Sequence, residues 1–436
     1  MLKRKMETVL MEWKDNPQRN PLVIKGCRQC GKTSTVLAFA KANYEKVVYI
    51  NFLENSEYGQ LFSGSLSVDY LAMLISSKFN TELVAGKTIL IFDEIQDCPE
   101  ARTALKFFKL DGRFDVIATG SLLGVSGYGK SPKSIPVGFE TILEMRPMDF
   151  EEFLWANGIK SDYIEFLHQC MKEEKIIPDA IHQQMRQLLL QYVVVGGMPA
   201  VVQSFVLRHD MAEVLRMQRD IVSGYRDDVV KYAEMRNKTL IRQCFDTIPV
   251  QLAKENKKFQ YSVVRKNGTA DQFRGILQWL EDAGIAKKCY NLHTPELPLV
   301  AQADNNIFKL YMADTGLFVS MLDDGTQSAI LMGQLSGYKG AIYENLMADF
   351  LIKMGRKLFY FRKDSGLEID FVIQRGQEAT LVEVKATQGN AKSLRSVMEN
   401  PERYRVNSAI KFGDYNIGRN GNILTLPLYL GFCLNR

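Results

Sequence analysis

The stretch "GCRQCGKT", residues 26–33, decides the fold of the N-terminal part of the chain, and it fits two motifs. Cys27 and Cys30 have the C-x-x-C spacing of a redox dithiol or of half a zinc site. The same residues fit G-x-x-x-x-G-K-[ST], the pattern of a loop that binds phosphate through its backbone. No second C-x-x-C completes a zinc site, and the four histidines lie far from both cysteines in sequence. The flanking residues must therefore decide between a dithiol and a phosphate loop.

Those flanking residues favour the phosphate loop. Leu22 to Ile24 form an apolar run that predicts a buried strand, and residues 34–43 have helical apolar spacing. In a strand–loop–helix unit the backbone N–H groups of the loop point at a phosphate, Lys32 adds positive charge, and the Thr33 hydroxyl binds Mg²⁺. The cysteines then occupy variable positions as small, tolerated residues. The residues predicted to bind ATP are Gly26, Cys27, Arg28, Gln29, Cys30, Gly31, Lys32, Thr33 and Ser34.

An acidic pair follows a second apolar run. In "KTILIFDEIQD", residues 87–97, four apolar residues precede Asp93 and Glu94. Phosphoryl transfer needs a carboxylate that holds Mg²⁺, expected to be Asp93, and one that orients the attacking water, expected to be Glu94. By itself such a pair is more typical of a helix N-cap. Its combination with the loop at residues 26–33 favours the catalytic roles.

A third run, "FDVIATGSLLG" at residues 114–124, predicts a strand over 115–118 followed by Thr119, Gly120 and Ser121. Ligands of a parallel sheet lie beyond the carboxyl ends of its strands, so Ser121 or Thr119 is expected to contact the γ-phosphate or the attacking water. A capped turn explains the same residues equally well. A further strand is expected over residues 141–145.

Composition limits the class of protein. The 436 residues, 46% of them hydrophobic, predict a globular protein of about three domains, on the rule of ~150 residues per domain. No apolar run reaches the ~18 residues that would cross a membrane, and the N-terminus lacks the apolar core of a signal peptide. The seven scattered cysteines indicate reduced thiols. We therefore expect a cytoplasmic protein without a membrane partner.

Taken together, these motifs resemble the AAA-type ATPases of bacteria and archaea that carry a C-terminal domain of unknown function. The resemblance rests on "KGCRQCGKT", "IFDEIQ", "ATGS" and "RPMDFEEFL", and it extends to "GGMPAVV" near Gly196 and "YMADTGLF" near Asp314. It implies an enzyme that uses ATP and Mg²⁺, and it makes a homo-oligomer a hypothesis for this chain.

One position departs from the family pattern, in which a Gly-Arg often precedes the last strand and is a candidate arginine finger. Here Gly138 is followed by Phe139, so the chain has no arginine at that position. Arg113, Arg146 and Arg226 are weaker candidates for a trans-acting arginine.

The positive charge of the chain is concentrated in its middle. Residues 236–295 hold eleven Lys/Arg and five Asp/Glu, a net charge of +6 in a chain whose total is +5. Three predicted helices, the first over residues 240–254, and two extended runs follow the order of a winged helix, which would make DNA a partner through residues 254–288. A winged helix that only packs against protein is the alternative. The cations expected to contact DNA are Lys257, Lys258, Arg265, Lys266, Arg274, Lys287 and Lys288.

The stretch "GLEIDFVIQRGQEATLVEVKAT", residues 366–387, predicts a strand, a hairpin and a strand. Side chains alternate on a strand, so Glu383 and Lys385 share a face, with Asp370 on the neighbouring strand and Glu344 on an upstream amphipathic helix. The order E…D…E-x-K is that of the restriction-endonuclease-like, or PD-(D/E)XK, core. Its three carboxylates are candidate Mg²⁺ ligands, and Lys385 would assist the attacking water in a nuclease.

We thus expect an α/β protein with four parts: a P-loop AAA-type ATPase core (1–150), a helical lid (151–235), a winged-helix domain (236–335) and a restriction-endonuclease-like domain (336–436). Lys32, Asp93, Glu94 and Ser121 would carry ATP hydrolysis, and the protein would act on DNA. Because a fold does not by itself confer an activity, the alternative is a nucleotide-switched DNA- or protein-binding platform whose nuclease-like domain does not cut.

Overall fold

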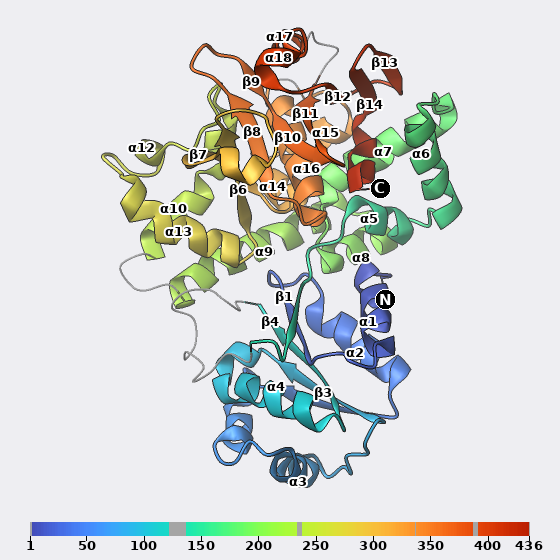
Figure 1. Cartoon of the computed structure of the whole chain (residues 1–436), viewed down its shortest axis with the longest axis vertical. Helices are drawn as coiled ribbons and strands as arrows, with labels where there is room; N and C mark the ends of the chain where they lie inside the picture. Colours follow the sequence, from blue (N-terminus) through green and yellow to red (C-terminus); the bar gives the residue numbers. More distant parts are fainter. Residues whose placement is uncertain (1, 122–136, 233–237, 336, 387–390, 436) are drawn as a thin grey trace. The chain divides into compact units, whose positions relative to one another are not determined.

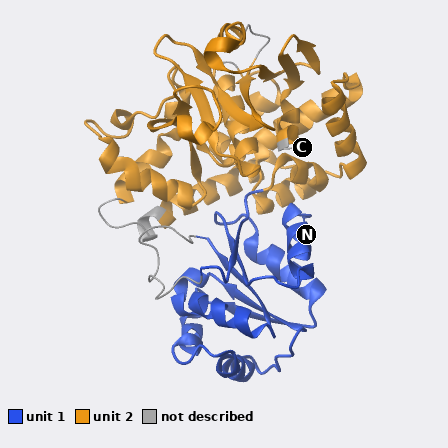
Figure 2. Ribbon diagram, in the orientation of Figure 1, with its two compact units in different colours: residues 1–147, 232–234 blue, residues 148–231, 235–436 orange. Residues whose placement is uncertain are grey.

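The computed structural model of the chain describes residues 2–121, 137–232, 238–335, 337–386 and 391–435. It divides into two compact units: unit 1 comprises residues 1–147 and 232–234, and unit 2 comprises 148–231 and 235–436 (Figure 2). Within the described ranges, no helix has both the length and the apolar character needed to cross a bilayer.

Unit 1 is built on a five-stranded sheet in the order β2-β3-β4-β1-β5, in which all neighbouring strands are parallel (Figure 1). Both faces of such a sheet are covered, which explains why its strands are continuous apolar runs. The strands are β1 (Leu22–Lys25), β2 (Lys46–Asn51), β3 (Thr88–Asp93), β4 (Asp115–Gly120) and β5 (Thr141–Glu144). The strands predicted for residues 22–24, 89–92, 115–118 and 141–145 are confirmed, whereas β2 was not predicted.

The core of unit 1 fixes the end of β3. Phe92 packs edge-on against Phe52, Phe62 and Phe108, with ring centroids 5.4–6.0 Å apart. Each such pair adds about 0.5–1.5 kcal/mol beyond its buried area, so the residue that follows Phe92 has a well-defined position. The helices of unit 1 are α1 (Lys5–Asp15), α2 (Lys32–Asn43), η1 (Ser56–Phe62), α3 (Val68–Phe79), η2 (Ile95–Asp97) and α4 (Pro99–Asp111).

Unit 2 contains two sheets, one in the order β7-β6-β8-β9 and one in the order β10-β11-β12-β14-β13. The hairpin predicted within residues 366–387 is confirmed as the antiparallel pair of β10 and β11. The two extended runs predicted after the helices of the basic segment form the antiparallel pair of β6 and β7, and β6 also pairs in parallel with β8. This sheet therefore joins strands from both sides of residue 335. The strands are β6 (Ala286–Leu292), β7 (Ala303–Met312), β8 (Leu358–Arg362), β9 (Glu368–Ile369), β10 (Phe371–Arg375), β11 (Glu378–Val384), β12 (Ser408–Gly413), β13 (Gly418–Asn420) and β14 (Ile423–Pro427).

Two helices of unit 2 differ from expectation. The predicted helix over residues 240–254 is two helices, because Pro249 has no N–H to continue the first one. The helix that carries Glu344 is buried at every position from Ala341 to Ile352 rather than amphipathic, because it contacts β7, β11 and η4. The helices are α5 (Phe150–Ala156), α6 (Ser161–Glu173), α7 (Asp179–Val195), α8 (Pro199–Arg208), α9 (Met211–Tyr232), α10 (Lys238–Asp246), α11 (Ile248–Ala253), α12 (Tyr261–Val264), α13 (Ala270–Asp282), η3 (Leu299–Gln302), α14 (Thr315–Ser320), α15 (Thr326–Leu331), α16 (Lys339–Lys353), α17 (Lys392–Met398), α18 (Pro401–Tyr404) and η4 (Leu428–Asn435).

The motifs "GGMPA" and "YMADTG" meet in the interior of unit 2. The Gly197 N–H donates to Asp314 Oδ2 at 2.7 Å, and a Cβ on Gly196 would lie 2.3 Å from Asp314 Oδ1. The Lys353 ammonium lies 3.2 Å from Asp314 and 2.8 Å from Asp349. Burial raises the pKa of Asp349 to about 6, although Lys353 opposes the shift. These motifs therefore form a buried polar junction in the fold.

Candidate functional site

Residues 26–31 form a tight loop between β1 and α2. Gln29 and Gly31 have left-handed φ values of 63° and 94°. A Cβ on Gly26 would lie 2.0 Å from the carbonyl oxygen of Met145, so only glycine fits there. The Arg4 guanidinium supports the loop by donating to the Cys30 carbonyl at 2.8 Å. The local sequence and the end of β5 together determine the shape of the loop.

Lys32 begins α2 and turns back into this loop. Its ammonium donates to the carbonyl oxygens of Gly26 at 3.0 Å and Cys27 at 2.9 Å, and the residue is 6% exposed. A lysine held over a loop at a helix N-terminus provides the positive charge that an anionic group needs.

The Thr33 hydroxyl lies beside the carboxylate of Asp93, 3.0 Å from Oδ2 and 3.2 Å from Oδ1. Asp93 also accepts hydrogen bonds from the Tyr49 hydroxyl at 2.7 Å and from the Thr119 hydroxyl. Burial, and then the bond to Asp93, raise the pKa of Tyr49. A hydroxyl and a carboxylate oxygen are the hard ligands that Mg²⁺ prefers, so this pair fits the ion. Tyr49 was not among the predicted site residues because no strand was predicted over residues 46–51.

Glu94 lies at the same edge of the sheet and is firmly held. Ser121 Oγ donates to its Oε1 at 3.0 Å, while the Ser121 N–H at 3.3 Å and Gln96 Nε2 at 2.5 Å donate to its Oε2. Glu94 has left-handed backbone angles, φ 52° and ψ 48°. This conformation costs a side-chain-bearing residue about 1–3 kcal/mol and persists only where neighbours impose it, often at functional sites. The structure thus brings together Thr33, Asp93, Glu94 and Ser121.

The two cysteines of the loop are buried, and the seven cysteines, all of which lie within the described residues, are reduced thiols. A hydrogen bond from Cys27 lowers the pKa of Cys30 to about 6, with Lys32 and Arg4 adding to the effect and burial opposing it. No group of three or more His, Cys, Asp or Glu side chains among the described residues is arranged to hold a metal, so the cysteines have no zinc-site partners.

The three candidate arginines are engaged in ion pairs. Arg146 pairs with Glu144 at 2.5 Å, Arg113 with Asp111 at 2.9 Å, and Arg226 with Asp246 at 2.8 Å. Each guanidinium already neutralises a carboxylate of its own unit, so the structure singles out none of them as an arginine finger.

In unit 2 the four predicted nuclease-like residues lie close together. Glu344 comes from α16, Asp370 lies between β9 and β10, Glu383 lies on β11, and Lys385 follows β11. Asp370 Oδ2 accepts the N–H of Val384 at 2.8 Å, and the Lys385 ammonium lies 2.5 Å from Glu383. Burial, and then the nearby charges of Glu383 and Glu344, raise the pKa of Asp370 well above its ordinary value. We call Glu344, Glu368, Asp370 and Glu383 the carboxylate cluster.

Two further lysines form ion pairs with this cluster, and these pairs were not predicted from the sequence. The Lys257 ammonium pairs with Glu344 Oε1. Lys309, whose side chain is 1% exposed, lies 2.7 Å from Glu368 and 3.6 Å from Glu344. The isolated lysine in the otherwise apolar run "IFKLYM" was the available signal for a buried ion pair. In the arrangement described, the cluster does not fit Mg²⁺, because lysines occupy its oxygens and no three of its carboxylates converge as a metal site among the described residues.

Some cations of the basic segment, residues 236–295, form ion pairs within unit 2. Lys288 lies 2.8 Å from Glu281, and the two side chains are only 10% and 14% exposed. Arg265 and Lys266, just after α12, are exposed, as is Arg274 on α13, which pairs with Asp271 at 3.0 Å. The cations accessible to a partner are therefore fewer than the sequence suggested.

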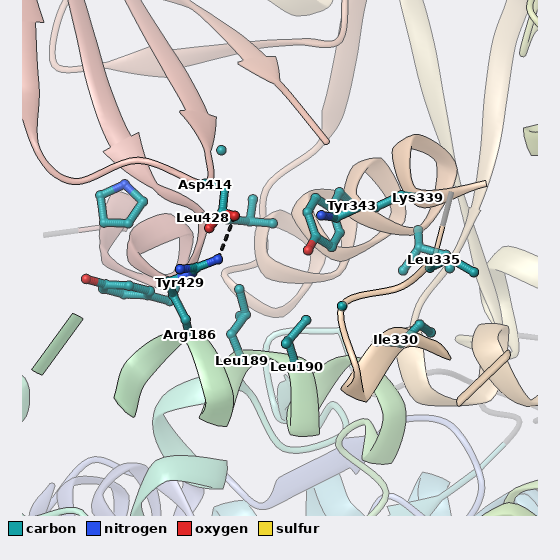
Figure 3. A pocket seen from close by; sticks show the side chains of 14 residues that line it. Arg186, Leu189, Leu190, Ile330, Leu335, Lys339, Tyr343, Asp414, Leu428 and Tyr429 are labelled. Atoms are coloured by element: carbon teal, nitrogen blue, oxygen red, sulfur yellow. Dashed lines mark hydrogen bonds and ion pairs between the residues drawn. The ribbon is translucent and has the colours of Figure 1, made fainter. Parts of the chain in front are cut away.

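Unit 2 also has a pocket of about 130 Å³, bounded by α7, α15, α16, and the residues around β14 (Figure 3). Leu189, Leu190 and Tyr343 give it an apolar lining, and Arg186 pairs with Asp414 at 2.6 Å on its wall. No residue predicted to act in either site lines this pocket.

Three family models match separate parts of the chain. Residues 18–154 match an AAA domain, residues 186–328 match a domain of unknown function (DUF8612), and residues 339–430 match another domain of unknown function (DUF4143). No curated protein matches the chain in sequence.

Several solved structures are similar at low identity. A Walker-type ATPase of Pyrococcus abyssi is 14% identical, with 74% of this chain and 96% of that chain covered and a TM-score of 0.43. The RuvB Holliday junction branch migration motor of Thermotoga maritima is 13% identical, covering 66% and 90% of the two chains, with a TM-score of 0.31. AMPPCP-bound DnaA from Aquifex aeolicus is 12% identical, covering 63% and 86%, with a TM-score of 0.28.

These TM-scores are too low to carry an inference about function, so the AAA match and the parallel sheet are the informative findings. The loop at residues 26–31, the strand order and the acidic pair at the end of β3 all lie within the matched range. Residues 18–154 therefore match an AAA domain and have the parallel sheet and glycine-framed loop of a P-loop NTPase fold.

Proposed function

We propose that unit 1 binds ATP with Mg²⁺ and hydrolyses it. The observation that carries this proposal is the placement of the Thr33 hydroxyl 3.0 Å from Asp93, beside the loop at residues 26–31. The fixed carboxylate of Glu94 at the same sheet edge adds a group suited to orient water. The match of residues 18–154 to an AAA domain supports the same chemistry.

Each residue has a distinct role in this proposal. The loop N–H groups and the N-terminus of α2 bind the triphosphate, and Lys32 exchanges its two carbonyl partners for phosphate oxygens. Thr33 and Asp93 hold Mg²⁺, which neutralises charge on the phosphate oxygens when bound. Glu94 orients the attacking water, and Ser121 keeps the Glu94 carboxylate in position. Tyr49 and Thr119 orient Asp93.

Lys32→Ala tests this proposal. Loss of a buried charged partner costs about 2–5 kcal/mol, so ATP affinity should fall at least about 30-fold by calorimetry. Lys41→Ala, which removes an exposed lysine from the last turn of the same helix, is the matched control and should leave the affinity unchanged. An unchanged ATP affinity in Lys32→Ala would refute the assignment of this loop.

We also propose DNA as a partner of unit 2. The order α10, α12, α13, β6 and β7 is compatible with a winged helix, and Arg265 and Lys266 are exposed cations near its third helix. Replacing both by alanine should weaken DNA binding equally for all sequences and reduce the salt slope by about 2, one per phosphate contact. A salt slope equal to that of the wild type would favour a winged helix that only packs against protein.

The C-terminal part remains a candidate restriction-endonuclease-like domain, supported by Glu344, Asp370, Glu383 and Lys385 in the order and proximity expected. The ion pairs of Lys257 and Lys309 with the carboxylate cluster favour the alternative, a domain that binds but does not cut. A cleavage assay with Mg²⁺ or Mn²⁺, with and without ATP, separates the two. If cleavage occurs and Lys385→Ala leaves it intact, this site is not responsible.

A further inference from the structure

We propose that Lys257 is an exchangeable internal cation that occupies the carboxylate cluster and excludes a divalent metal ion from it. The cluster, whose carboxylates do not converge as a metal site among the described residues, is then a latent cation site: withdrawal of the segment 254–258 frees Glu344 to turn toward Asp370 and Glu383 around a divalent cation. This inference deepens the proposal for the C-terminal domain. It depends on the cluster being a cation site and not on the domain cutting DNA.

Lys257 reaches the carboxylate cluster from outside any helix or strand. It lies in the irregular segment between α11 and α12, and its ammonium contacts Glu344 Oε1, while the Tyr311 hydroxyl donates to Glu344 Oε2 at 3.0 Å. Neighbouring contacts hold the segment against the cluster, since Asn256 Oδ1 accepts from Arg362 at 2.5 Å. A lysine predicted to face DNA is thus committed to a carboxylate inside its own unit.

The contrast with Lys309 identifies which cation can leave. Lys309 lies within β7, its side chain is 1% exposed, and moving it would break a ten-residue strand. The Lys257 side chain is 18% exposed and belongs to no regular element, so it can swing into water without disturbing a sheet. Withdrawal of Lys257 is therefore a local change.

Charge compensation also depends on Lys257. Three carboxylates of the cluster have cation partners: Glu344 pairs with Lys257 and Lys309, Glu368 with Lys309 and Arg362, and Glu383 with Lys385. Removal of Lys257 leaves the buried Glu344 with Lys309 alone, which is 3.6 Å away and shared with Glu368, and this loss is unfavourable. A divalent cation bound by carboxylate oxygens is the compensation that such hard ligands favour.

One carboxylate oxygen of the cluster has no hydrogen-bond donor. Glu383 is only 4% exposed, and its buried Oε2 receives no hydrogen bond among the described residues. Buried acceptors normally have a partner, so an unsatisfied carboxylate oxygen next to Asp370 marks an incomplete site. The compact Lys257 ammonium satisfies Glu344 and leaves Glu383 Oε2 unsatisfied.

Calorimetric titration of the nucleotide-free full chain with Mn²⁺ tests the proposal. Lys257→Met, which keeps the apolar stem and removes the charge, should gain an Mn²⁺ site at least about tenfold tighter than any in the wild type, a difference of one decade in Kd. Adding Glu344→Gln should abolish the new site. Lys257→Arg keeps the cation and Lys258→Met removes a neighbouring one, so neither should gain the site.

Thermal unfolding gives an independent readout, because a ligand that binds only the folded state raises Tm. Mn²⁺ should raise the Tm of Lys257→Met and not that of the wild type. If Lys257→Met does not fold, Lys257→Gln serves the same comparison. The proposal is overturned if the wild type binds Mn²⁺ through Glu344 as tightly as the variant does, or if the folded variant gains no site. Mn²⁺ binding without DNA cleavage would support the inference while removing the nuclease function.

Discussion

Replacing Glu94 by glutamine should stop ATP turnover and leave ATP binding intact. The substitution is nearly isosteric, and the surrounding hydrogen bonds can accept it. The glutamine carbonyl can take the place of Oε2, which accepts from the Ser121 N–H at 3.3 Å and from Gln96 at 2.5 Å. The new NH₂ group then faces the Ser121 hydroxyl, 3.0 Å away, which can rotate to accept. The site should therefore keep its shape and lose only the charge and basicity of Glu94.

The magnitude follows from the role proposed for this carboxylate. A positioned base contributes about 10²- to 10⁴-fold to a reaction rate, which corresponds to about 2.7–5.4 kcal/mol of transition-state stabilisation. Because Lys32, Thr33 and Asp93 are untouched, ATP affinity should change by less than about 1 kcal/mol, the scale of one neutral hydrogen bond. The Glu94→Gln variant should thus lose ATP turnover while it keeps ATP affinity.

Phosphate release at saturating ATP and Mg²⁺ measures turnover, and calorimetry on the same preparations measures ATP affinity. Glu57→Gln is the control, since it removes one exposed charge from unit 1; its carboxylate lies 3.9 Å from Lys78 at the surface. Wild-type turnover in Glu94→Gln would refute the role of Glu94. Parallel losses of binding and turnover would show instead that Glu94 supports the nucleotide site rather than the attacking water.

The remaining predictions concern the loop cysteines and the buried junction of unit 2. Cys27→Ala and Cys30→Ala should each leave ATP affinity within about threefold, less than 1 kcal/mol, because phosphate binding uses the loop backbone; a loss like that of Lys32→Ala would assign a role to the thiols. Burial raises the folded-state pKa of Asp349 from 3.8 to about 6, so its ionisation destabilises the fold as pH rises. The free energy of unfolding of the wild type, relative to Asp349→Asn, should therefore fall by up to about 3 kcal/mol between about pH 4 and about pH 7. A pH-independent difference in urea unfolding would contradict the burial of an ionising Asp349.

Much of unit 1 could be predicted from the sequence because its determinants are local. A strand, a glycine-framed loop and a helix are contiguous in residues 22–43, and the acidic pair comes at the end of a fully buried strand, with Asp93 its last residue. Parallel strands bring such loops to one edge, so the proximity of Thr33 and Asp93 was expected. Tyr49 was missed because the strand "KVVYIN" alternates between partly buried and buried positions and has no flanking turn motif.

Unit 2 shows where local patterns stop being informative. The E…D…E-x-K order correctly predicted that Glu344, Asp370 and Glu383 would lie together, since a helix and a hairpin place them on adjacent elements. It said nothing of Lys257 or Lys309, which reach the same carboxylates from segments far upstream. A pairing between Lys257 and Glu344, 87 residues apart, has no signature in either local stretch.

The sequence by itself thus determined the glycine-framed loop of unit 1, because such a loop is encoded in consecutive residues whose backbone conformation depends on glycine and on the helix that follows. Only the tertiary structure decided which cations neutralise the carboxylate cluster of unit 2. Buried charges must be compensated by whichever cations the fold brings near, and the packing of β7 and the segment 254–258 against α16 supplied lysines where the motif alone predicted a metal ion.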